Sequence, residues 1–157
     1  MQGSGVFLKQ VEQEALRGIK KNLGGPFGAV IVLDGVVIGK GRNMVTSKND
    51  PTAHAEIEAI RDACLARNSF LLKGAVLYST CEPCPMCLGA IYWARIETVY
   101  YRSTRLDAAE AGFDDSFIYA EFNKAVSARK LKMVHVQDGD AESLFSIWKE
   151  KEDKIPY

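Results

Sequence analysis

The spacing of hydrophobic residues predicts a helix followed by a pair of strands. Apolar residues recur every three or four positions over residues 4–23, the period of an amphipathic helix, and Gly24-Gly25 would end that helix. Two β-rich apolar segments follow at 27–33 and 36–41. The Asp34-Gly35 pair between them is a strong signal for a two-residue hairpin turn. These two strands are therefore expected to be antiparallel.

The remainder of the chain is predicted to alternate between helices and strands. In chain order these are a helix at 52–67, a strand at 75–80, a helix at 84–95, a strand at 98–103, a short helix at 106–111, a strand at 131–137 and a helix at 141–154. A hairpin followed by β-α-β units predicts an α/β fold, a three-layer α-β-α sandwich with a mixed five-stranded sheet. Two inner helix faces follow from the same spacing: Ala53, Ile57, Ile60 and Cys64 on the helix at 52–67, and Leu144, Phe145 and Trp148 on the last helix.

The residues around two of the helix starts carry candidate chemistry. His54 precedes Glu56 by two positions, and Cys84 and Cys87 have C-x-x-C spacing. Right-handed crossovers would place these helices side by side, with both positive N-termini directed at one spot. One imidazole and two thiols are three zinc ligands, whereas structural zinc sites use four, so a position would remain for water. Zinc lowers the pKa of bound water from about 15.7 to about 7.

The spacing H-x-E followed by P-C-x-x-C matches the signature of zinc-dependent nucleobase deaminases, in which the glutamate carries protons. Two alternatives involve Cys81. It would be the fourth ligand of a structural zinc site, although its position before Glu82-Pro83 is typical of a strand end. With Cys84 and Cys87 it also forms a C-x2-C-x2-C run, but the fourth cysteine and trailing proline of the ferredoxin pattern are absent. Both half-motifs favour the open zinc site.

Composition narrows the class of protein. A chain of 157 residues with 47% hydrophobic and 25% charged residues is typical of one globular domain. Its formal net charge of zero disfavours DNA or tRNA as the substrate. The longest apolar run, at 87–94, is too short to span a membrane, and residues 1–5 lead into a charged amphipathic stretch. A cytoplasmic protein is therefore expected, in which clustered cysteines favour metal binding over disulfides.

The chain resembles the cytidine deaminase-like zinc hydrolases, and more closely their bacterial guanine deaminase branch. The segments that carry the resemblance lie at 24–30, 49–56, 81–95 and 108–117. The metal motif is shared with cytosine, cytidine and tRNA adenosine deaminases, whereas the segment at 112–117 is the one that points to guanine. The resemblance implies hydrolytic deamination of guanine to xanthine and ammonia, a reaction of purine catabolism or salvage.

Roles for individual residues follow from the resemblance. It implies one zinc ion per chain, bound by His54, Cys84 and Cys87, with Glu56 as the catalytic proton shuttle. It also implies a set of contacts to a small purine base: Asn43, Asp115, the backbone of Ala55, the aromatic rings of Phe27 and Phe113, and Tyr157. The carbonyl of Glu82 is expected to accept from the departing amine. In close relatives the C-terminal segment is exchanged between subunits. A homodimer is therefore implied, in which residues from about 138 to 157 of this single deaminase domain are swapped and Tyr157 completes the partner's pocket.

The substrate prediction has a physical side and two rivals. A carboxylate such as Asp115 can accept from N1–H or N9–H of guanine, and if it faces N9 a ribose would remove that donor. Sites built around such a bond discriminate by about 10⁴–10⁵. One rival is a relative that acts on guanosine or on adenosine in tRNA, and the tRNA enzyme would bind RNA with strong salt dependence. The other is a non-catalytic module that zinc holds together through four protein ligands.

Overall fold

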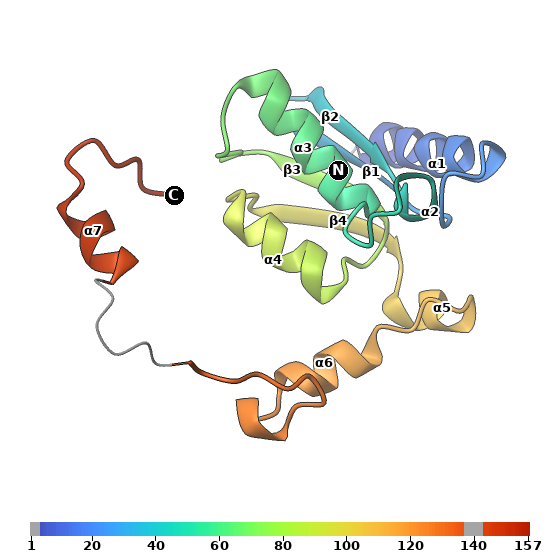
Figure 1. Cartoon of the computed structure of the whole chain (residues 1–157). Helices are drawn as coiled ribbons and strands as arrows, with labels where there is room; N and C mark the ends of the chain where they lie inside the picture. Colours follow the sequence, from blue (N-terminus) through green and yellow to red (C-terminus); the bar gives the residue numbers. More distant parts are fainter. Residues whose placement is uncertain (1–3, 137–142) are drawn as a thin grey trace. The chain divides into compact units, whose positions relative to one another are not determined.

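The computed structural model describes residues 4–136 and 143–157 (Figure 1). Contacts within the chain divide it into two units, residues 1–118 and residues 119–157. In the two described ranges no helix is both long enough and apolar enough to cross a membrane. All the residues discussed below as a candidate site, apart from Tyr157, belong to the first unit.

The first unit is built on a four-stranded mixed sheet with the strand order β2-β1-β3-β4. β1 (Gly28–Leu33) pairs antiparallel with β2 (Val36–Arg42) and with β3 (Val76–Cys81), whereas β3 and β4 (Thr98–Ser103) are parallel. The predicted hairpin turn is present. Asp34 and Gly35 have φ angles of 51° and 77°, and positive values at both positions are what a type I′ turn requires. The first four predicted strands are thus confirmed.

Helices cover both faces of this sheet, as Figure 1 shows. Successive residues of a strand point to opposite faces. On β1, Ala29 and Ile31 pack in one core with α3 (Ala55–Arg67) and α4 (Pro85–Trp93). Val30 packs in a second core with α1 (Ser4–Lys20). The predicted three-layer arrangement is therefore confirmed.

The packing of α3 on β2 is close because the facing strand residues are glycines. A β-carbon at Gly39 would lie 2.5 Å from the carbonyl oxygen of Ala59, and one at Gly41 would overlap the carbonyl oxygen of Ala55. Only small side chains fit on the helix face that approaches so closely. The predicted inner face of this helix was therefore wrong in part. Its fully buried positions are Ala55, Ala59 and Ala63, while Ile57, Ile60 and Cys64 are half-buried at the flanks.

Three further helical details differ from the prediction. α3 begins at Ala55 rather than near Thr52, because the N–H of Thr52 is held in a turn by Asp50 Oδ1 at 2.8 Å. α2 (Val45–Lys48) and α6 (Ser116–Phe122) were not predicted. α5 (Arg105–Glu110) was predicted, and a capping box between Thr104 and Asp107 fixes its start.

The second unit contains the end of α6, the 3-10 turn η1 (Val126–Ala128) and α7 (Leu144–Glu150). The strand predicted at 131–137 is wrong, because residues 131–136 form no strand and Gln137 lies outside the described residues. An alternating segment becomes a strand only with a pairing partner. The sheet therefore has four strands rather than five.

The predicted inner face of the last helix is also wrong within this chain. Leu144 and Phe145 are 80% and 78% exposed, and Trp148 is 43% exposed. The helix is shorter than predicted, and residues 141 and 142 of the prediction lie outside the described residues. In the described part of this unit, α6, η1 and α7 have no buried residue.

Candidate active site

The three predicted metal ligands lie together at the N-termini of two adjacent helices. His54 is the N-cap residue of α3, Cys84 is the N-cap residue of α4, and Cys87 lies in the first turn of α4. The Nδ1 atom of His54 is 3.6 Å from the Sγ atoms of both cysteines. Zinc bound tetrahedrally, with Zn–N near 2.05 Å and Zn–S near 2.3 Å, would separate these atoms by about 3.6 Å. The donor set and its spacing therefore fit zinc.

Cys81 is not a member of this group, which consists of His54, Cys84 and Cys87 among the described residues. Its Sγ donates to the carbonyl oxygen of Thr104 at 3.4 Å. Burial raises the pKa of the Cys81 thiol to about 11, which keeps it protonated. A fourth protein ligand and a three-cysteine cluster both lack support.

The electrostatics of the group favour a thiolate. A hydrogen bond from Cys87 and a second one from His54 lower the pKa of Cys84 to about 4, against the opposing effect of burial. The same contact with Cys84 raises the pKa of His54. Thiolate is the form of cysteine that binds metal ions, so the site holds a ligand ready for a cation.

Glu56 is buried beside the metal-ligand group. Its carboxylate accepts from Ser79 Oγ at 2.7 Å through Oε1 and from Cys87 Sγ at 3.4 Å through Oε2. Burial is the main cause that raises the pKa of Glu56, and the hydrogen bond from Ser79 opposes that rise. A buried carboxyl group whose pKa is raised is suited to take up and release a proton.

Ser79 was missed by the sequence analysis. It lies on β3, its side chain is fully buried, and its register opposite Ala29 of β1 places it near Glu56. A small polar residue within a buried strand was the available signal, since buried hydroxyl groups require hydrogen-bond partners. The sequence alone does not say which partner that is.

A cavity of about 110 Å³ opens at the metal-ligand group. It is lined by residues from six segments of the first unit: Phe27, Asn43, His54, Glu56, Cys81, Glu82, Cys84, Arg105, Ala108, Phe113 and Asp115. The structure thus brings together the residues predicted to contact substrate, apart from Ala55 and Tyr157. Ala55 is fully buried on α3, and Tyr157 belongs to the second unit.

Asn43 is held so that its amide NH₂ group remains for a ligand. Its Oδ1 atom accepts from the backbone N–H groups of Gly25 at 3.1 Å and Val45 at 3.3 Å. A β-carbon at Gly24 would overlap this oxygen, so a glycine is needed at that position. In the part of the chain that the structure describes, the oxygen is occupied and the NH₂ is the remaining hydrogen-bonding group.

The cavity also has an aromatic wall and an acidic residue. Phe27 and Phe113 pack edge to face, with ring centroids 4.9 Å apart and an interplanar angle of 84°. Asp115 is half-buried, and burial raises the pKa of its carboxyl group, with a smaller contribution from Cys84. A flat heterocycle with N–H donors is the kind of ligand that such a wall and carboxylate can bind.

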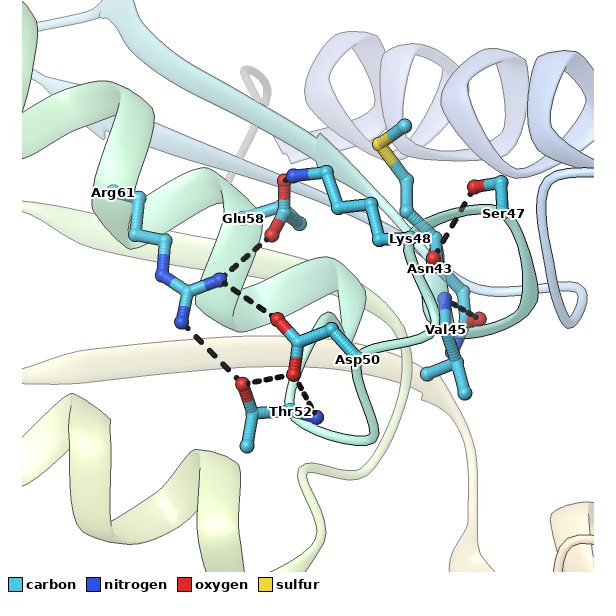
Figure 2. A network of polar contacts seen from close by, with 9 residues as sticks. Asn43, Val45, Ser47, Lys48, Asp50, Thr52, Glu58 and Arg61 are labelled. Carbon is cyan, nitrogen blue, oxygen red and sulfur yellow. Dashed lines mark hydrogen bonds and ion pairs between the residues drawn. The ribbon is translucent and has the colours of Figure 1, made fainter.

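The loop between Asn43 and His54 is closed by its own contacts. Its ends are joined by a hydrogen bond from Met44 N–H to the carbonyl oxygen of Ala53 at 2.9 Å. Figure 2 shows Arg61 of α3 reaching across to Asp50 of this loop, 3.6 Å away. The loop therefore helps to hold Asn43, at the polar end of the cavity, at its distance from the metal-ligand group.

The sequence analysis also missed Arg105 and Ala108 of α5. They reach the cavity because the parallel strands β3 and β4 end at the same edge of the sheet, where α4 and α5 begin. The backbone N–H of Arg105 donates to Glu82 Oε2 at 3.1 Å, which joins the two strand ends. The signal that could have identified α5 was the parallel arrangement of β3 and β4, because helices that follow parallel strands begin at the same edge of the sheet.

Comparisons with known proteins agree with this geometry. The family model for the cytidine and deoxycytidylate deaminase zinc-binding region matches residues 1–103. Guanine deaminase of Bacillus subtilis (strain 168) is 50% identical over 151 residues, which are 96% of this chain and 97% of that protein. A solved structure of guanine deaminase from Bacillus subtilis superposes with a TM-score of 0.94, at 50% identity and with 98% of each chain covered.

Similarity to deaminases of another substrate is less extensive. A tRNA-specific adenosine deaminase of Aquifex aeolicus (strain VF5) is 44% identical over 110 residues, which are 70% of this chain and 71% of that protein. The zinc-binding region is thus common to both kinds of relative. The similarity to guanine deaminase extends beyond this region, which ends at residue 103, and covers nearly the whole chain.

Proposed function

Because the chain belongs to the cytidine and deoxycytidylate deaminase family of zinc-binding proteins, we propose that it deaminates guanine hydrolytically, to xanthine and ammonia. The observation that carries the reaction type is the buried Glu56 beside a three-ligand metal group at the base of a cavity. The substrate is supported by the near full-length similarity to a guanine deaminase.

We assign His54, Cys84 and Cys87 as the ligands of one zinc ion per chain. Zinc held by three protein ligands supplies water that is activated at neutral pH. Glu56 would take a proton from this water and give it to N3 of the purine as the water oxygen bonds to C2. Glu56 would then take the second proton, from the C2 hydroxyl group, and give it to the 2-amino group, which leaves as ammonia when the C2–N bond breaks. The carbonyl oxygen of Glu82 accepts a hydrogen bond from the departing amine.

Recognition of the base follows from the remaining donors and acceptors of the cavity. The NH₂ of Asn43 donates to an acceptor of the purine, and Asp115 accepts from one of its ring N–H groups. Phe27 and Phe113 pack against the flat ring. The N–H of Ala55 is at the first position of α3, where a helix leaves backbone donors without an internal acceptor, so it can contact the substrate.

We further propose a homodimer in which the C-terminal segment is exchanged and Tyr157 reaches the partner's pocket. The support is that α6, η1 and α7 contain no buried residue in the described chain. Phe145 is 78% exposed and Tyr157 is 74% exposed. A segment of this size cannot form its own core and needs a surface to cover. We place the protein in the cytoplasm, because a reducing compartment preserves thiolate ligands.

Deleting residues 155–157 tests the exchange. The KM for guanine should rise, while zinc content and the dimeric mass in solution stay as in the full chain. Size-exclusion chromatography with light scattering gives the mass. A monomeric full chain, or a KM that the deletion leaves unchanged, would contradict a role of the tail in the pocket.

Ammonia release from guanine, guanosine, cytosine and an anticodon stem-loop tests the substrate. The zinc-loaded protein should act on guanine alone, and deamination of the stem-loop alone would contradict the proposal. Glu56→Gln should retain one zinc per chain and lose nearly all turnover. Asp62→Asn is the matched control, because Asp62 lies on the same helix and accepts from Lys40 N–H at 2.9 Å, away from the cavity. Retained activity in Glu56→Gln would remove Glu56 from its role.

A further inference from the structure

One buried carboxylate has no part in the proposed reaction. Glu14 of α1 has a side chain that is only 3% exposed. Its Oε2 atom accepts from Nε of Arg42 at 3.0 Å and lies 2.7 Å from Nη2 of the same guanidinium. Its Oε1 atom accepts from Nη1 of Arg17 at 2.8 Å. A charge buried in this way is stable only when it is fully paired, so its position needs an explanation.

Arg42 lies directly beside two residues of the cavity. It is the last residue of β2 and pairs in register with Gly28, the first residue of β1. The ladder extends one step further, since Asn43 N–H donates to the carbonyl oxygen of Phe27 at 3.0 Å. Both Phe27 and Asn43 line the cavity. The ion pair of Glu14 with Arg42 therefore holds the Gly28–Arg42 position of the ladder. This position is next to Phe27 and Asn43, which are proposed to contact the substrate.

The backbone of α1 is pressed against this point of the sheet. A β-carbon at Gly28 would overlap the carbonyl oxygen of Val11, and it would lie 2.7 Å from the backbone nitrogen of Ala15 and 3.3 Å from Cβ of Glu14. Neighbouring residues of a strand point to opposite faces. While Arg42 reaches α1, the next residue, Asn43, lines the cavity.

We propose that Glu14 and Arg42 are positioning residues, whose ion pair fixes α1 against the ends of β1 and β2 and so holds Phe27 and Asn43 in register for the base. This inference rests on the proposed function, because it takes Phe27 and Asn43 to contact the substrate. Neither Glu14 nor Arg42 lines the cavity. Both act through the backbone of the residues that do.

Arg42→Met keeps much of the aliphatic stem and removes the guanidinium fork. The KM for guanine should rise about tenfold, which is the effect of losing roughly one good hydrogen bond. The kcat should stay within about twofold, because the contacts of Asn43 with the base are similar in the ground state and the transition state. Zinc should remain at one ion per chain. Arg42→Lys keeps the charge without the guanidinium fork, and its KM for guanine should lie between those of the wild type and Arg42→Met.

Arg17→Met is the matched control. Arg17 bonds to the same carboxylate, but its side chain is 57% exposed and it lies on α1 rather than on the strand. Its loss should leave KM unchanged. If Arg42→Met fails to fold, Glu14→Gln combined with Arg42→Met removes both charges and avoids an unpaired buried carboxylate. The double variant should show the same rise in KM.

Repeating Arg42→Met in an Asn43→Ala background distinguishes a positioning role of Arg42 from a purely structural one. If Arg42 acts through Asn43, Arg42→Met should raise KM there by much less than in the wild type. An equal rise in both backgrounds would overturn the proposal. So would a KM that Arg42→Met leaves unchanged while the melting temperature falls.

Hydrogen exchange tests the positioning without any substrate. The N–H groups of Asn43 and Gly25, bonded to Phe27 and to Asn43 Oδ1, should exchange at least tenfold faster in Arg42→Met than in Arg17→Met. Amides within β3 should exchange alike in both variants. Unchanged exchange at Asn43 overturns the positioning role even if the protein proves inactive on guanine, whereas inactivity of the wild type overturns the proposed function alone.

Discussion

Replacing Ser79 by alanine should change the pH dependence of the reaction more than its maximal rate. The hydroxyl of Ser79 donates to Glu56 at 2.7 Å in a fully buried setting. Because that hydrogen bond favours the ionised carboxylate, it opposes the rise in the pKa of Glu56 that burial causes. Its removal should therefore raise the pKa of Glu56 further. Glu56 must be ionised to accept a proton, so the acid limb of the pH–rate profile should move to higher pH.

The size of the effect follows from the kind of hydrogen bond. A hydrogen bond to a charged group contributes about 1.5–3 kcal/mol. Since about 1.4 kcal/mol is a factor of ten, kcat/KM at a fixed pH on the acid limb should fall roughly tenfold to a hundredfold. Near the top of the profile the loss should be smaller, because Glu56 is ionised there in both proteins. The cavity left by one hydroxyl is small and should not release the metal.

The assay is ammonia release from guanine across the pH range, with zinc content measured on each sample. Ser69→Ala is a control for the same chemical change, since the Ser69 hydroxyl bonds to the backbone of Leu71 in a turn. An acid limb that stays in place, with kcat/KM unchanged, would refute the argument. Loss of zinc from Ser79→Ala would show that the hydroxyl supports the metal group instead.

Other predictions follow from single contacts. Gly41→Ala places a β-carbon against the carbonyl oxygen of Ala55, and the overpacking should lower the free energy of unfolding by about 1–3 kcal/mol in denaturant titrations. Cys81→Ser should retain zinc by atomic absorption, and metal loss would restore the four-ligand alternative. The backbone N–H of Thr104 lowers the pKa of Asp107, so the stability difference between wild type and Asp107→Asn should vanish as pH falls through that lowered pKa, measured by thermal melts.

The sequence analysis predicted the metal group well because its geometry is local. Cys84 and Cys87 lie within one helical turn, and a right-handed crossover is enough to bring His54 beside them. The positions of Ser79 and Arg105 in the site could not be predicted from local spacing or from the handedness of a crossover. Their place in the site depends on the register of β1 with β3 and on the edge at which β3 and β4 end.

The errors in the predicted fold have one physical source. The spacing of hydrophobic residues in a segment does not show which other segment it will pair with or pack against. The alternation at 131–137 is correct for a strand, but no strand pairs with residues 131–136 in the described chain. On α3 the isoleucines fit a helical stripe. The two glycines of β2 bring the helix so close that alanines fill the interface instead. Secondary-structure propensity and hydrophobic period are properties of one segment, whereas the burial of a side chain depends on both segments that meet at the interface.

Close approach at glycines also connects the fold to the chemistry. Without side chains at Gly39 and Gly41, the start of α3 lies directly on β2, whose next residues lead to Asn43. Gly28 does the same for α1 on the other face, and Gly24 lets the chain pass over the side chain of Asn43. The distance between the metal-ligand group and the polar end of the cavity is therefore set by backbone packed on backbone. Such contacts are stiff, because a packed interior has no free volume into which a strand can shift. A substitution that moves α3 by even a fraction of an ångström would displace His54 and Glu56 together, relative to Asn43, and would also change the distances between His54 and the two cysteines of α4.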